Sequence, residues 1–178
     1  MKKITTCLVL FWGIVQVSGQ KDSIYIEAKL SSDRKMLEVN QEIVYYNHSG
    51  KDLHSVKLLN WVSAYNKKGT SLVYRKLEDR NSDLHFAKTG QLGKLLDLQI
   101  KNSAQQPVPV NSNTDENLFL PLTEALKPGE SVKLQLQYRM LLPDKKFTGY
   151  GTSDQITALK YFFIVPDHFD PDNISRRN

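Results

Sequence analysis

Cysteine is almost absent from this sequence of 178 residues, whose single copy is Cys7. One cysteine cannot form an internal disulfide, so a small scaffold stapled by disulfides is excluded. Long apolar runs are equally scarce, and the one candidate lies at the very start of the chain, which excludes a membrane protein with several helical spans. The length fits one domain and excludes most two-domain enzymes. Hydrophobic residues (40%) and charged residues (24%) occur at ordinary globular levels, which is enough to build a core.

The first 19 residues have the pattern of an export signal. A basic start at Lys2 and Lys3 precedes an apolar run over residues 7–17, and small residues then lead into a polar segment. The run is shorter than the roughly 20 residues of a spanning helix, so we expect residues 1–19 to be a cleaved signal peptide; an uncleaved membrane anchor is the alternative. The protein is then exported, to the periplasm, the cell surface or the medium, and has no transmembrane helix after cleavage. The remaining chain lacks cysteine, which suits an exported protein that does not rely on disulfides.

Stripes of basic residues are missing as well. The net charge is +5, of which Lys2 and Lys3 contribute two units, and charges of both signs are well mixed along the rest of the chain. No run of Lys and Arg alternates with aromatic residues, so we expect no nucleic acid among the partners.

Catalytic and metal-binding motifs are also lacking. The four histidines, His48, His54, His85 and His168, do not form H-E-x-x-H or any other spacing typical of metal ligands. No G-x-S-x-G elbow occurs, and no cysteine remains after residue 19 to act as a nucleophile. We therefore predict no catalytic, metal-binding or cofactor-binding residue in this chain.

What the sequence does contain is a succession of strand patterns. Residues 24–30 alternate apolar and polar side chains, and two similar runs, 36–47 and 53–61, follow after short turns. Three strands joined by short turns predict an antiparallel meander. Further strands are predicted over residues 95–101, 132–142 and 159–166. The fold class predicted for residues 22–172 is therefore all-β, an antiparallel β-sandwich or a saddle-shaped curved sheet. Residues 173–178 are expected to be a polar tail or the truncated start of a following domain.

The middle of the chain is less regular. Residues 71–87 predict one or two helical turns followed by a short strand. In the strand over residues 95–101, Leu96, Leu98 and Ile100 are expected to share one face. Pro107 and Pro109 exclude a central strand position for the segment around them. Residues 111–117 predict a polar loop.

Two groups of side chains are candidates for binding. Trp61 and Tyr65 offer a stacking platform for a sugar, although a tryptophan at a strand end more often belongs to the core or its rim. Asp167, Asp170 and Asp172 could supply oxygen ligands to Ca²⁺. Their spacing is not that of a calcium loop, so a solvated loop is the simpler interpretation.

Five stretches of the chain resemble a known family: residues 25–30, 37–47, 53–65, 120–122 and 126–134. They are similar to the N-terminal domain of the gluzincin zinc aminopeptidases of the membrane alanyl aminopeptidase group. The exported bacterial branch is the most similar, because it shares "Y-x-N-x-S" before a strand that leads to "W-x-x-A-Y". The "L-x-P-G-E-S" turn also matches, although other β-sandwiches contain it.

The resemblance implies a saddle-shaped β domain that packs against a helical catalytic domain, which carries G-x-M-E-N and the zinc motif H-E-x-x-H. Neither motif occurs in this chain, so the resemblance transfers no zinc ligand or catalytic residue. Two functions remain open: a truncated or split aminopeptidase-like protein without its catalytic domain, and a stand-alone exported module that binds a peptide, glycan or cell-surface partner. An independent hydrolase has no constellation to support it. The unbroken apolar run Phe162, Phe163, Ile164 and Val165 is predicted to face, in part, the missing catalytic domain or partner protein.

Overall fold

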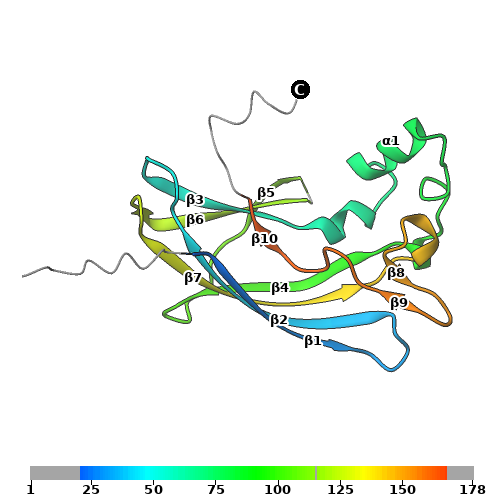
Figure 1. Ribbon diagram of the computed structural model, residues 1–178, viewed down its shortest axis with the longest axis horizontal. Coiled ribbons are helices and arrows are strands. Elements are labelled where there is room, and N and C mark those ends of the chain that lie inside the picture. Colours follow the sequence, from blue (N-terminus) through cyan, green and yellow to red (C-terminus); the bar gives the residue numbers. More distant parts are fainter. Residues whose placement is uncertain (1–20, 115, 168–178) are drawn as a thin grey trace, which may run out of the picture.

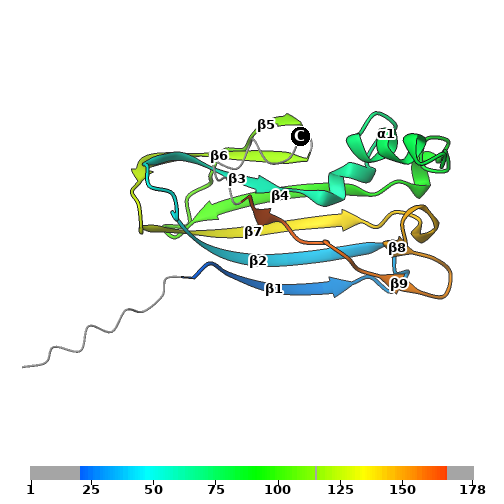
Figure 2. The ribbon, with the colours of Figure 1, turned by 45° about the horizontal axis from the view of Figure 1, so that its top comes forward.

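The computed structural model describes residues 21–114 and 116–167 (Figure 1). The predicted signal peptide and the predicted polar tail lie outside the described residues. Two four-stranded antiparallel sheets face each other, and a short hairpin and one helix lie at one end of them (Figures 1 and 2). The predicted all-β, sandwich-like fold is therefore confirmed. Within the described part of the chain, no helix is long and apolar enough to cross a membrane.

The first sheet, sheet A, has the strand order β1-β2-β7-β4. These strands are β1 (Ser23–Leu30), β2 (Met36–Tyr46), β7 (Ser131–Leu141) and β4 (Lys94–Asn102). The second sheet, sheet B, has the order β10-β3-β6-β5. Its strands are β10 (Val165–Pro166), β3 (Leu53–Leu59), β6 (Asn117–Leu126) and β5 (Asn111–Thr114). The remaining elements are η1 (Trp61–Tyr65), α1 (Ser71–Glu78), η2 (Thr89–Gln91), η3 (Lys145–Phe147) and the hairpin of β8 (Gly151–Thr152) with β9 (Thr157–Ala158).

Alternation along the strands builds the main core. In β2 and β7 every second residue is buried and its neighbours point outward, as the period of two dictates. The inner face of sheet A meets that of sheet B, which contributes Val56, Leu58, Leu118 and Leu120. The core therefore lies between the two sheets, and each sheet keeps one outer face for other contacts.

The predicted three-strand meander is wrong, because β3 belongs to the other sheet. β2 pairs with β1 and β7, whereas β3 pairs with β6 and β10. Asn47, at the end of β2, is 1% exposed, and its amide donates to the carbonyls of Lys51 (2.8 Å) and Leu126 (2.7 Å). These bonds hold the turn after β2 against the end of β6, so the chain crosses to the second sheet instead of folding back.

The irregular middle region contains the predicted helix but not the predicted strand after it. The Thr70 hydroxyl caps α1 by accepting from the Val73 amide at 3.4 Å, and it also donates to the Ala64 carbonyl at 2.6 Å. Residues 83–86 form turns instead of a strand. Leu84 and Ala87 pack with Val73 and other residues in a small second core beside α1, which replaces strand pairing as the source of order there.

Three local expectations about residues 95–117 are confirmed only in part. A bulge in β4 falls between Leu96 and Gln99, so Leu95, and not Leu96, shares the core-facing side with Leu98 and Ile100. Pro107 forms only an isolated bridge with Lys101 beside the edge of β4, in keeping with its exclusion from a central strand. Residues 111–114, expected to be loop, form the short edge strand β5.

Candidate functional site

Both aromatic residues singled out from the sequence line one hollow, which we call the aromatic hollow. Its volume is about 500 Å³. It lies where η1 and α1 meet the segments around residues 148–150 and 160–161. Its lining residues include Trp61, Tyr65, Arg75, Lys76, Asp79, Glu116, Thr148, Tyr150, Lys160 and Tyr161.

Four aromatic rings shape the aromatic hollow in two pairs. The ring centroids of Trp61 and Tyr161 are 6.4 Å apart, and these residues are 48% and 74% exposed. Tyr65 packs against Tyr150 with ring centroids 5.4 Å apart. The Tyr65 hydroxyl forms a hydrogen bond of 2.7 Å with the Thr148 hydroxyl. Burial raises the pKa of Tyr65 and Tyr150, so both hydroxyls stay protonated at neutral pH. One pair is thus exposed for stacking, and the other forms the floor.

The Tyr150 hydroxyl is the least satisfied group of the aromatic hollow. Tyr150 is 4% exposed, and its hydroxyl has no hydrogen-bond partner among the described residues. An unpaired buried hydroxyl is costly, so a bound water or ligand atom would stabilise it. Charged residues of both signs line the hollow: the cations are Arg75, Lys76 and Lys160, and the acids are Asp79 and Glu116. The arrangement suits binding and offers no nucleophile and base pair.

The apolar segment predicted as an interface is divided between two roles. Ile164 is 1% exposed and belongs to the main core. Its amide donates to Gln41 Oε1 at 3.3 Å, and Gln41 Nε2 donates back to the Ile164 carbonyl. The Tyr138 hydroxyl donates to the same Gln41 Oε1 at 2.6 Å. Phe162 packs on this core as well, so these two residues are accounted for within the domain itself.

Phe163 and Val165 are different, because they are half-buried and, within the described residues, belong to neither core cluster. Val165 is opposite Leu59 in the ladder between β10 and β3, and so shares the outer face of sheet B with it. Phe119 and Pro121 lie on the same face of β6, opposite Lys57 and Ser55 of β3. We call Leu59, Phe119, Pro121 and Val165 the apolar strip; all four are half-buried.

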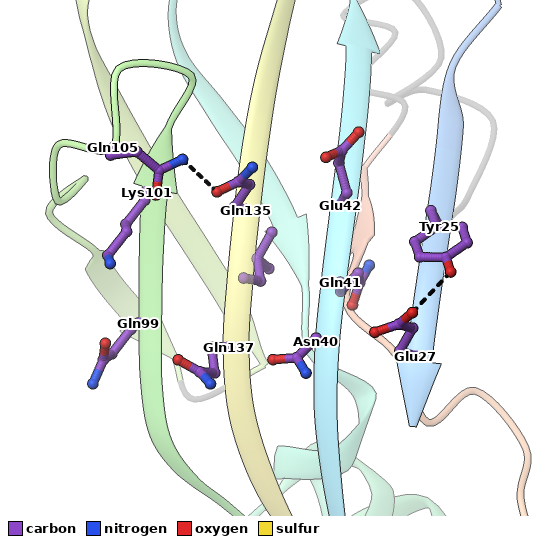
Figure 3. A pocket seen from close by; sticks show the side chains of 11 residues that line it. Tyr25, Glu27, Asn40, Gln41, Glu42, Gln99, Lys101, Gln105, Gln135 and Gln137 are labelled. Atoms are coloured by element: carbon purple, nitrogen blue, oxygen red, sulfur yellow. Dashed lines mark hydrogen bonds between the residues drawn. The ribbon is translucent and has the colours of Figure 1, made fainter. Parts of the chain in front are cut away.

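The outer face of sheet A is polar and hollowed, and we call this surface the amide groove. Its volume is about 290 Å³. Figure 3 shows its side chains projecting from all four strands of sheet A. The lining residues are Tyr25, Glu27, Asn40, Gln41, Glu42, Gln99, Lys101, Gln105, Gln135, Leu136 and Gln137. Sequence reasoning missed this surface, although alternating polar residues in β2 and β7 gave a signal for it.

Hydrogen bonds fix the two ends of the amide groove. The Tyr25 hydroxyl donates to Glu27 at 2.9 Å, and this bond, together with the Glu27 charge, raises the pKa of Tyr25. At the other end Gln105 donates to Gln135 Oε1 at 2.7 Å, from the turn that follows β4 (Figure 3). Glu42 pairs with Lys133 at 2.8 Å. With Glu27 and Glu42 against Lys101 and Lys133, the formal charges at the groove balance.

The gluzincin resemblance places its zinc in the catalytic domain, so it implies no zinc site among the described residues. Among them no group of three or more His, Cys, Asp and Glu side chains could hold a metal ion. His48 contacts Asp22 at 3.1 Å. Asp167 of the predicted acidic group pairs with Lys57 at 2.6 Å; His168, Asp170 and Asp172 lie outside the described residues.

Comparison with known proteins does not assign the chain to a family. No model of a protein family matches the chain, and no curated protein is significantly similar to it. The resemblance to the gluzincin aminopeptidases therefore stays a prediction. The candidate surfaces are the aromatic hollow, the apolar strip and the amide groove, and each suits binding.

Proposed function

We propose that this chain is an exported, non-catalytic β domain of a zinc-aminopeptidase-like protein. In this proposal it packs against a catalytic domain that holds the zinc and removes N-terminal residues from peptides. The sequence resemblance supplies the identity of that partner. The apolar strip supplies the surface through which the two would meet.

The single observation that carries the proposal is the contrast between the two outer faces of the sandwich. An antiparallel sheet that faces water carries polar residues on that face, as sheet A does with Asn40, Gln99 and Gln137. Sheet B instead places Leu59, Phe119, Pro121 and Val165 outward, around the ion pair of Lys57 with Asp167. Covering such side chains contributes about 25 cal/mol per Å² of apolar surface, which favours a partner on this face.

A second candidate is a stand-alone exported module that binds a peptide, glycan or cell-surface partner. The observation in its favour is the pair of exposed rings at the aromatic hollow, Trp61 and Tyr161. Exposed aromatic side chains are enriched at binding surfaces, because they supply a large contact area at a low cost in conformational entropy. In this case the chain would act without a catalytic domain.

The two candidates differ in what the isolated chain should do with a hydrophobic dye. We expect the purified chain to bind bis-ANS and to self-associate, because the apolar strip stays partly exposed among the described residues. The double variant Phe119→Ser/Val165→Thr should lose most of the dye signal. Val44→Thr is the matched control, since Val44 is a half-buried valine on the outer face of sheet A.

Loss of dye binding in the strip variant alone supports docking through sheet B. If the chain is a monomer that binds no dye, the apolar strip needs no partner and the proposal fails. Equal effects of the strip variant and the Val44 control would also contradict it. Circular dichroism of all variants establishes that each one is folded before the dye signals are compared.

A further inference from the structure

We propose that the amide groove is a binding site for a neutral, hydroxyl-rich ligand, namely a short oligosaccharide. This inference does not depend on the proposed function, because the amide groove and the apolar strip lie on opposite outer faces of the sandwich. It rests on how the strand register places side chains, on which of them lack partners, and on the balance of charge.

The ladder of sheet A sets the lining residues in two straight rows. In the first row, Glu27 is opposite Asn40, Asn40 is opposite Gln137, and Gln137 is opposite Gln99. In the second row, Tyr25, Glu42, Gln135 and Lys101 follow one another in the same way. Neighbouring strands are about 4.8 Å apart, so each row is about 14 Å long, and the rows lie about 6.7 Å from each other. Figure 3 shows both rows across the four strands.

The centre of the first row is free to bind. Asn40, Gln137 and Gln99 are exposed, and their amides have no hydrogen-bond partner among the described residues. The second row is different, because Gln135 accepts from Gln105 and Glu42 pairs with Lys133. Three adjacent strands therefore present three unoccupied amides in a line, beside a row that is already held in place.

The chemistry of these amides suits hydroxyl groups. Each side-chain amide offers an acceptor oxygen and two N–H donors, and a sugar hydroxyl both donates and accepts. A row of amides can therefore bond successive hydroxyls without leaving a polar atom unpaired. Tyr25, 64% exposed at the β1 end, presents an aromatic face on which the apolar side of a sugar ring can stack. Five-stranded oligonucleotide- and oligosaccharide-binding barrels also use a strand face for ligands.

Other ligand classes fit the amide groove less well. A nucleic acid or another polyanion would need a cluster of cations, and Lys101 is the only cation among the lining residues, against Glu27 and Glu42. A peptide in an extended conformation needs apolar pockets for alternate side chains, and the lining offers Tyr25 and little else that is apolar and exposed. Neutral hydroxyl-rich chains need neither.

The test is two-dimensional NMR of the ¹⁵N-labelled chain titrated with cellohexaose, maltohexaose, xylohexaose and mannohexaose. At least one of these probes should shift the side-chain amide signals of Asn40, Gln99 and Gln137. An open groove of this kind predicts a dissociation constant of about 1 mM. The triple variant Asn40→Ala/Gln99→Ala/Gln137→Ala should weaken binding more than about tenfold, since several hydrogen bonds are lost together.

The matched control is Gln155→Ala, which removes an exposed amide far from the amide groove. It should bind the same probe as the unchanged chain does. The proposal is overturned if none of the four probes shifts the groove amides at saturating concentration. Shifts centred on Trp61 and Tyr161, or binding that survives in the triple variant, overturn it as well, as does a response to an extended peptide of neutral residues in place of the sugars.

Discussion

Replacing Gln41 by leucine tests how the last strand is anchored to the core. Gln41 is 4% exposed and joins β2 to the segment at Ile164 and to the Tyr138 hydroxyl. Leucine has a similar size but makes no hydrogen bond, so the Ile164 carbonyl loses its donor and the Tyr138 hydroxyl loses its acceptor. An unsatisfied buried group costs about 1–3 kcal/mol, so Gln41→Leu should lower the free energy of unfolding by about 2–5 kcal/mol.

Tyr138→Phe is the matched comparison, because it removes one donor to Gln41 and one acceptor of the Ile164 amide (3.4 Å) but leaves Gln41 bonded to Ile164 on both sides. It should cost only about 1 kcal/mol. Urea unfolding followed by circular dichroism measures both changes, and with a typical slope the leucine variant should lower the midpoint by roughly 1–2 M. Hydrogen exchange of the Ile164 amide, which also donates to the Tyr138 hydroxyl at 3.4 Å, should accelerate more in the leucine variant, because that variant alone also leaves the Ile164 carbonyl without its bond. Equal costs for the two variants, or unchanged exchange at Ile164, would refute the anchoring role.

Two further predictions concern pH and glycine. Burial raises the pKa of the Tyr138 and Tyr150 hydroxyls, so the unfolded chain loses these protons first, and stability should fall as the pH rises above about 10. Thermal unfolding between neutral and high pH checks this, and a flat profile above pH 10 would contradict it. Gly151 has φ +117°, and an added Cβ would lie 2.0 Å from the Pro143 carbonyl oxygen, so Gly151→Ala should cost about 3 kcal/mol or more. Gly50→Ala, where nothing lies within 4 Å, should change stability by less than about 0.5 kcal/mol, and similar costs in the two variants would show that the close approach is not the cause.

Strands β1, β2, β3, β4 and β7 could be predicted because alternation is a local property. In contrast, β5 was expected to be loop, and of the strand predicted over residues 159–166 only Val165–Pro166 is strand. Residues 36–46 and 131–141 alternate in burial as their sequence indicates. The assignment of β3 to the second sheet could not be predicted, because it depends on bonds from Asn47 to a carbonyl 79 residues away. The face predicted for Leu96 was also wrong, because a bulge in β4 shifts every residue on one side of it to the other face.

For the candidate surfaces too, features that are local in the sequence could be predicted, and features that depend on the fold could not. Trp61 and Tyr65 are close in sequence and could be selected together, but Tyr150 and Tyr161 join them only through the fold. The amide groove depends on the register of four strands, in which Asn40 and Gln137 become neighbours. A sequence without aligned relatives gives no sign of that pairing. The apolar run at residues 162–165 was visible, whereas its division between core and outer face depends on the position of Ile164 between the sheets.

The most direct test of the central claim is the size and activity of the native product, captured from its own cells with an antibody against residues 21–167. The account predicts that the captured species contains a catalytic domain, joined to this chain or tightly bound to it. That species should release N-terminal residues from peptides and lose this activity on zinc chelation. A captured species close to the mass of the chain alone, with no bound partner and no peptidase activity, would contradict the account.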